Sequence, residues 1–204
     1  MPRLMLLSAA SLAALAFAAC GDNSNLATTT TPADTTTVDT ATADAEASVR
    51  EAQDFVNNSA QASLVEIRTS EMALQKSKNA DVKAFAQMMI DQHKAAGESL
   101  KAAASAAALA PPPETLDDFH MRRINDLTET DGDEDFDADY AALQVDAHND
   151  AIKLFEGYST KTGTVMQIKE FADKTMPTLT AHKIEAERVR DAVTKKDDKA
   201  PNPS

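Results

Sequence analysis

The chain has 204 residues, a formal net charge of −13, five glycines and a single cysteine. Its acidity argues against nucleic-acid binding, because contacts to phosphates need clustered lysine and arginine. One cysteine excludes a disulfide within the chain. The scarcity of glycine and the many Ala, Lys, Glu and Leu residues favour an all-α protein.

Residues 1–19 have the character of a secretory signal peptide. Arg3 precedes an apolar run that ends in small residues before Cys20, and this run is too short and too lightly flanked to span a membrane. Residues 17–20 (FAAC) resemble a bacterial lipobox, in which the cysteine receives lipid after cleavage; ordinary cleavage at the preceding alanines is the alternative. Lipidation predicts a membrane anchor, and Gly21 favours a periplasm-facing lipoprotein of a Gram-negative outer membrane.

Residues 20–45 predict a lipidated cysteine followed by a disordered tether. Nine threonines lie between positions 28 and 42, and large apolar residues are almost absent. Such a segment buries too little surface to offset its chain entropy. With a second disordered tail at 196–204, one domain is expected over 46–195.

Within this domain, apolar residues recur at the i, i+3/i+4, i+7 spacing of helices with one buried face. Four long helices are therefore expected, at about 47–77, 80–108, 137–160 and 164–193. Short turns join the first to the second and the third to the fourth, so each pair forms an antiparallel hairpin. The connection between the second and third helices is long enough to run the length of the domain. These features predict a four-helix bundle with one long crossover.

One nine-residue pattern occurs twice. Residues 85–93 read FAQMMIDQH and residues 140–148 read YAALQVDAH, and both end on a histidine. A second similarity links residues 81–86 with 167–172. We interpret the domain as two similar helical hairpins.

Each predicted helix carries one metal-competent side chain on its inward face. These residues are Glu66, His93, His148 and His182. Three imidazoles with a carboxylate or water suit one divalent ion, such as zinc, copper or iron. Asp91 and Asp146 stand two residues before two of the histidines, which turns them by about 200° onto solvated faces.

The sequence argues against one further kind of metal site and leaves open a metal-free interpretation of the buried polar residues. A di-iron centre needs Glu-x-x-His on two helices, but Ile90, Val145 and Leu179 stand three residues before the histidines, which argues against ferroxidase chemistry. Alternatively, the bundle is metal-free and Glu66 accepts hydrogen bonds from the rings.

Several segments resemble a bacterial secreted family of ferritin-like four-helix proteins, whose members are labelled domain of unknown function or outer-membrane protein. They are LVEIRTSEMALQKSKNADVKAFAQMMIDQH, HNDAIKLFE and MPTLTAH, and the resemblance covers about Glu51 to Val193. It implies a ferritin-like fold and no established activity. The family pattern has Asp directly before the first two histidines, where this chain has Gln92 and Ala147.

Two functions from different classes are therefore expected. The first is an envelope lipoprotein that binds a divalent metal in its bundle for storage, buffering or stress protection. The second is a metal-free envelope module that binds a protein or envelope component and uses its buried His/Glu network structurally; the sequence identifies no protein partner. An enzyme is less favoured, because no nucleophile–base pair or phosphate-binding glycine loop is present.

Overall fold

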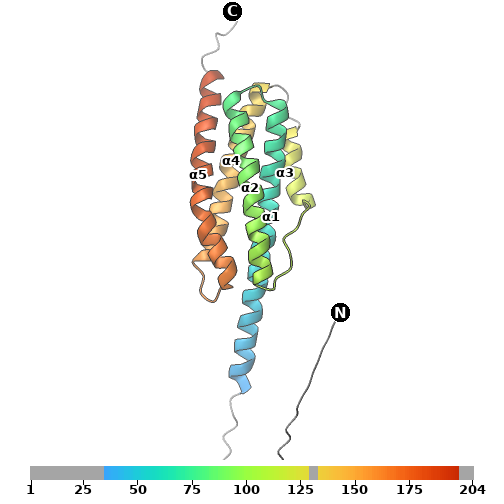
Figure 1. Ribbon diagram of the computed structural model, residues 1–204, viewed down its shortest axis with the longest axis vertical. Helices are drawn as coiled ribbons and strands as arrows, with labels where there is room; N and C mark the ends of the chain where they lie inside the picture. Colours follow the sequence, from blue (N-terminus) through green and yellow to red (C-terminus); the bar gives the residue numbers. More distant parts are fainter. Residues whose placement is uncertain (1–34, 129–132, 198–204) are drawn as a thin grey trace, which may run out of the picture. The chain divides into compact units, whose positions relative to one another are not determined.

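The computed structural model describes residues 35–128 and 133–197 (Figure 1). Its elements are α1 (Thr35–Lys76), α2 (Ala80–Ala106), α3 (Asp118–Thr128), α4 (Asp133–Ser159) and α5 (Met166–Asp197). The all-α prediction is confirmed over these residues, among which no helix is both long and apolar enough to cross a membrane. The predicted signal peptide and Cys20 lie outside the described residues.

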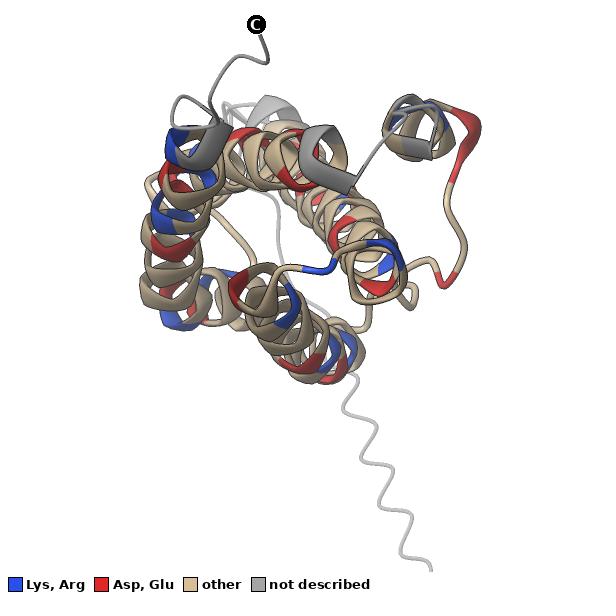
Figure 2. Ribbon diagram, turned by 90° about the horizontal axis from the view of Figure 1, so that it is seen from above, with Lys and Arg blue, Asp and Glu red and all other residues tan. Residues whose placement is uncertain are grey.

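The four long helices α1, α2, α4 and α5 lie side by side, and α3 lies outside them (Figures 1 and 2). α1 and α5 run in one direction, whereas α2 and α4 run in the other. The turn between α1 and α2 is as short as expected, and Asn79 caps α2 by accepting a hydrogen bond from the backbone N–H of Asp81. In the turn between α4 and α5, Gly163 takes a φ of +74°, which glycine adopts without strain.

The start of the first helix differs from the prediction. A tether was expected up to residue 45 and a helix from about residue 47, whereas α1 already begins at Thr35. Alanine recurs at every second position from 41 to 47, and alanine is the strongest helix former. Side chains from 40 to 46 are exposed, so this part of α1 extends the helix into solvent without joining the core.

The apolar core consists of two clusters. The Phe55 cluster packs around Phe55, whose ring centroid lies 4.5 Å from that of Tyr158 and 4.9 Å from that of Phe155. The Tyr140 cluster includes Phe85, whose ring centroid lies 6.0 Å from that of Tyr140. On α2, α4 and α5 the two clusters are separated by one buried histidine each, and on α1 by a run of buried polar residues that includes Glu66, which positions a polar layer between two apolar halves.

The connection between α2 and α4 is fixed to α1 by two glutamines. Gln53 Oε1 accepts a hydrogen bond from the backbone N–H of Ala110 at 2.8 Å. Two helical turns later, Gln61 donates to the carbonyl of Thr115 at 2.9 Å and accepts from the backbone N–H of Asp117 at 3.1 Å. These bonds hold the connection along α1, which places α3 outside the four long helices.

Truncating a buried ring should expose how much each cluster contributes. We expect Phe85→Ala and Phe171→Ala to lower the free energy of unfolding by about 3–5 kcal/mol, because each removes a buried aromatic side chain and leaves a cavity. Phe171 borders a pocket and should fall at the lower end. Denaturant unfolding measures the effect, and the exposed Phe119→Ala is the control, expected within about 0.5 kcal/mol of the native protein. Losses below about 1 kcal/mol at both buried sites would contradict the core assignment.

Candidate metal centre

Three histidines from three helices meet in the polar layer. His93 lies on α2, His148 on α4 and His182 on α5, and all three are buried. Their ring centroids are 5.2 to 5.8 Å apart. One ring nitrogen of each lies within 4.8 Å of the others. The structure thus brings the three histidines named from the sequence to one level.

The repeated nine-residue segment accounts for two of these histidines. At its start, the rings of Phe85 and Tyr140 are 6.0 Å apart; at its end, the rings of His93 and His148 are 5.8 Å apart. Eight residues of helix span about 12 Å, so α2 and α4 run parallel and in register over that length. Equal spacing from aromatic to histidine therefore places both histidines at the same depth.

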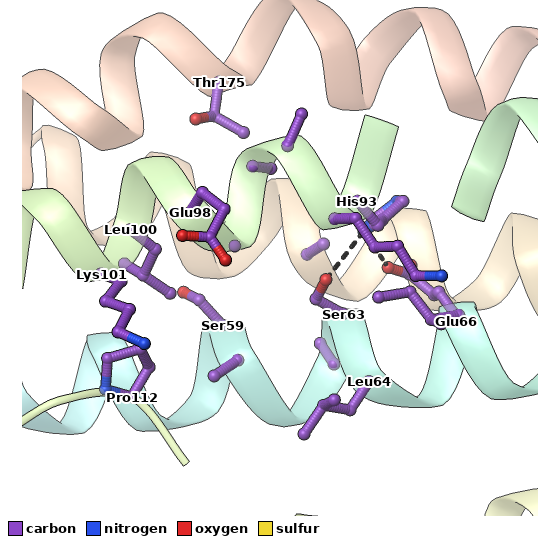
Figure 3. A pocket seen from close by; sticks show the side chains of 18 of the residues that line it. Ser59, Ser63, Leu64, Glu66, His93, Glu98, Leu100, Lys101, Pro112 and Thr175 are labelled. Carbon is purple, nitrogen blue, oxygen red and sulfur yellow. Dashed lines mark hydrogen bonds and ion pairs between the residues drawn. The ribbon is translucent and has the colours of Figure 1, made fainter. Parts of the chain in front are cut away.

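Glu66 on α1 lies against two of the rings, and Figure 3 shows it beside His93. Its Oε2 is 3.1 Å from His93 Nδ1 and its Oε1 is 3.4 Å from His148 Nδ1. Ser63 Oγ is 3.2 Å from the same nitrogen of His93. His148 Nδ1 also lies 2.8 Å from the carbonyl oxygen of Gln144, which can only accept a hydrogen bond. The Nδ1 atoms of His93 and His148 therefore carry the protons, which leaves the Nε2 lone pairs free.

His182 is oriented in the same manner through its other nitrogen. Its Nε2 lies 2.8 Å from Oε1 of Gln92 on α2, so Nε2–H donates to the amide oxygen and Nδ1 keeps a lone pair. His93 Nε2, His148 Nε2 and His182 Nδ1 are buried and have no hydrogen-bond partner among the described residues. Unsatisfied buried polar atoms are uncommon and destabilising. Three of them on neighbouring rings form a set of donors suited to a cation.

Burial also favours the neutral form of His93 and His182. Burial lowers the pKa of His93, and this effect is partly opposed by the Glu66 carboxylate. Burial lowers the pKa of His182 to about 3, with further contributions from the neighbouring His93 and His148. Because a metal binds deprotonated imidazole, these shifts favour the binding form at neutral pH.

Glu66 has a different place from the one expected of a ligand. The sequence put it in the metal site, and the structure does bring it to the histidines, but its oxygens face the protonated Nδ1 atoms of two rings. A carboxylate in this position fixes the tautomer and orientation of metal-binding histidines. Asp91 and Asp146 are exposed, as expected.

Sequence reasoning missed two contacts. Gln92 lies on the exposed side of α2, yet its long side chain reaches His182; the sequence signal was that it occupies the place where the resembling family has Asp. Ser63 stands three residues before Glu66, on the same side of α1. The fourth histidine of the chain, His120, is half-buried, with Nδ1 2.7 Å from Asp117, and has no part in the three-histidine group.

The donor set fits a borderline divalent ion. A tetrahedral Zn²⁺ holds imidazole nitrogens at about 2.0–2.1 Å, and therefore roughly 3.3 Å from one another. The rings would have to close by up to about 1.5 Å on binding, starting from nitrogens within 4.8 Å of one another. Neutral imidazoles suit zinc or copper better than magnesium or calcium, which prefer oxygen ligands.

Comparison with known proteins gives a family and no activity. A family model described as Domain of unknown function (DUF4142) matches residues 36–189. The matched range includes all four residues of the polar layer. No match was found among curated proteins or among solved structures.

The metal-free protein should lose stability as pH falls through the imidazole range. An unfolded histidine titrates near pH 6.5, and His182 in the folded protein near 3, so between these values the unfolded state binds more protons. Stability should decline from about pH 6.5 downward, by roughly 1–2 kcal/mol between pH 7.5 and 5 for His182 alone. Denaturant unfolding in the presence of a chelator measures this slope. His182→Gln should flatten it and His120→Gln should retain it; equal slopes in both variants would contradict the assignment.

Proposed function

Because the chain belongs to the DUF4142 family, whose function is unknown, we propose its function from its own residues: it binds one divalent transition-metal ion between α2, α4 and α5. The ligands in this proposal are His93 Nε2, His148 Nε2 and His182 Nδ1. Two observations carry it: one ring nitrogen of each of these histidines lies within 4.8 Å of the others, and each buried ring keeps one nitrogen without a hydrogen-bond partner in the described part of the chain.

The charges around the proposed ion are favourable. A divalent cation held by three neutral imidazoles lies next to the buried carboxylate of Glu66, which offsets part of its charge. A carboxylate bonded to the far nitrogen of a ligating histidine also raises the basicity of that ligand. Glu66 thus acts through His93 and His148 without contacting the ion.

Zinc and copper fit this site best. For nitrogen ligands, affinity among divalent first-row ions rises from manganese through iron to copper, with zinc below copper. Three histidines leave one position of a tetrahedral ion open to water or a small ligand. A site that holds one buried ion per chain suits a protein that buffers the metal concentration or protects the cell from excess metal. Storage would be limited to one ion per chain.

We also propose that the four long helices form a ferritin-like bundle. α1 and α5 run opposite to α2 and α4, and the long connection between α2 and α4 carries the chain from one end of the helices to the other. One-crossover bundles have this topology. The carboxylates of a di-iron centre are replaced here by Ile90, Val145 and Leu179, so this bundle carries a different kind of site.

The location we propose is the periplasmic face of an outer membrane, where Cys20 bears the lipid anchor. The apolar run before Cys20, the small residues next to it and the threonine-rich segment after it support this assignment. Metal buffering in the envelope is consistent with such an exported, anchored protein.

Metal binding should raise the melting temperature with the logarithm of excess ion, since the ion binds the folded state. At a hundredfold excess over Kd, the gain of about 2.7 kcal/mol corresponds to roughly 5–10 °C. Thermal melts of the chelator-treated protein with zinc, copper, manganese and iron measure the shift. We expect His93→Ala and His148→Ala to abolish it, and Glu66→Gln to weaken binding about 10–100-fold.

Asp91→Ala and Asp146→Ala are the matched controls, because each removes an exposed carboxylate two residues from a proposed ligand. Both should retain the full shift. If no ion shifts the native protein, or if the histidine variants shift equally, the polar layer is structural and the envelope interaction module becomes the better explanation.

The anchor has its own test. Cys20→Ser removes the only thiol that can take the lipid, so the protein should be released in soluble form or accumulate as an unprocessed precursor. Fractionation of cells that produce the native and variant chains measures this. Unchanged recovery of the variant with the outer membrane would show that lipid on Cys20 is not the anchor.

A further inference from the structure

A pocket of about 520 Å³ lies next to the metal centre, between α1 and α2 (Figure 3). Small-molecule sites commonly have volumes of about 300–1,000 Å³ and mostly apolar walls with a few polar groups. The apolar wall here includes Leu100, Phe155, Phe171 and Leu179. One end of the pocket meets the polar layer, because His93 and Glu66 both line it.

The pocket exists because small residues occupy inward positions. On α2, Gly97 follows His93 by four residues and precedes Leu100 by three, so it lies on the buried stripe of the helix. A Cβ atom added at Gly97 would meet no other atom within 4 Å. On α1, Ser59 and Ala62 line the same space. Larger apolar side chains at these positions would fill it.

One residue of the pocket wall carries a hydroxyl without a hydrogen-bond partner. Ser59 lines the pocket, is only 6% exposed, and its Oγ has no hydrogen-bond partner in the described part of the chain. Helical serines and threonines often bond to the carbonyl four residues earlier, as Thr69 does to Val65, but Ser59 does not. Figure 3 places Ser59 between α1 and α2; its Oγ is buried, so the hydroxyl has to rotate about the Cα–Cβ bond to meet a molecule bound in the pocket.

The charged residues around the pocket do not favour a charged ligand. Three acids and two bases line it, namely Glu66, Glu98, Glu114, Lys94 and Lys101. Lys101 is 3.5 Å from Glu114, which offsets its charge, and the Glu66 carboxylate lies 3.1 and 3.4 Å from the Nδ1 atoms of two histidines. No excess of positive charge is left for an anion.

We propose that this pocket binds a neutral, mostly apolar small molecule through one hydrogen-bonding group that meets Ser59. This goes beyond metal binding and does not require it, since the apolar wall and Ser59 are independent of the three ring nitrogens. The bound molecule lies against His93 and Glu66, at the side of the metal centre.

The test uses N-phenyl-1-naphthylamine, a neutral fluorescent probe with two aromatic groups and one N–H. It is titrated into the purified, chelator-treated chain, and binding is followed by fluorescence. Gly97→Leu fills the pocket and should weaken binding at least about tenfold. Gly157→Leu is the matched control, because Gly157 is also helical and a Cβ added there meets nothing within 4 Å, but it does not line this pocket. Both changes favour helix, and melting temperatures verify folding.

Two further arms test the chemistry of the site. Ser59→Ala should weaken binding roughly threefold to tenfold through loss of one hydrogen bond, and Ser59→Leu should block it from the opposite wall. 1-Anilinonaphthalene-8-sulfonate has the same rings with an added anionic group, and should bind at least about tenfold more weakly. Native-like probe binding by a folded Gly97→Leu or Ser59→Leu chain would overturn the site, and equal affinity for the two probes would overturn its preference for neutral ligands.

Discussion

The contact of Glu66 with two imidazole Nδ1 atoms is the interaction on which the rest of the structure depends. A carboxylate removed from water carries a desolvation penalty of several kcal/mol unless nearby groups compensate it, and here His93 and His148 supply that compensation. The compensation requires α1, α2 and α4 to meet at one level. A slip of any of them by one helical turn, about 5.4 Å, would separate the carboxylate from its donors. On His93 and His148 the same contacts favour a proton on Nδ1 and leave Nε2 free, together with the Gln144 carbonyl on His148, whereas Gln92 has this role on His182.

The helices and the inward positions of the histidines follow from the sequence because both depend on periodicity. Residues at i, i+4 and i+7 share a face whatever the neighbouring helix does, so His93, His148 and His182 could be assigned to the interior. The atomic roles could not, because they depend on which ring nitrogen faces which neighbour. Glu66 was therefore named as a ligand, although its oxygens lie against protonated nitrogens. Gln92 was missed for a related reason, since a long side chain on an exposed face can still reach the adjacent helix.

The repeated nine-residue segment has a simpler cause than the duplicated hairpin that the sequence suggested. Duplication of a hairpin would relate α2 to α5, whereas the repeated segment relates α2 to α4. These two helices run in the same direction past the same layers, so both carry an aromatic residue in the Tyr140 cluster and a histidine eight residues later. Because both segments pack against the same apolar cluster and the same polar layer, similar residue patterns on α2 and α4 need no duplication of a hairpin. The parallel direction of α2 and α4 comes from the long connection, which Gln53 and Gln61 fix to α1.

The polar layer also divides the core, and this division affects how the protein unfolds locally. The Phe55 and Tyr140 clusters are separate groups of buried side chains, and between them the four long helices are joined through imidazole and carboxylate contacts. Proteins open in cooperative units whose boundaries follow such weak planes of packing. We therefore expect that, without an ion, one half can open while the other stays packed. An ion that ties α2, α4 and α5 together would couple the two halves, so that the protein opens as a whole or not at all.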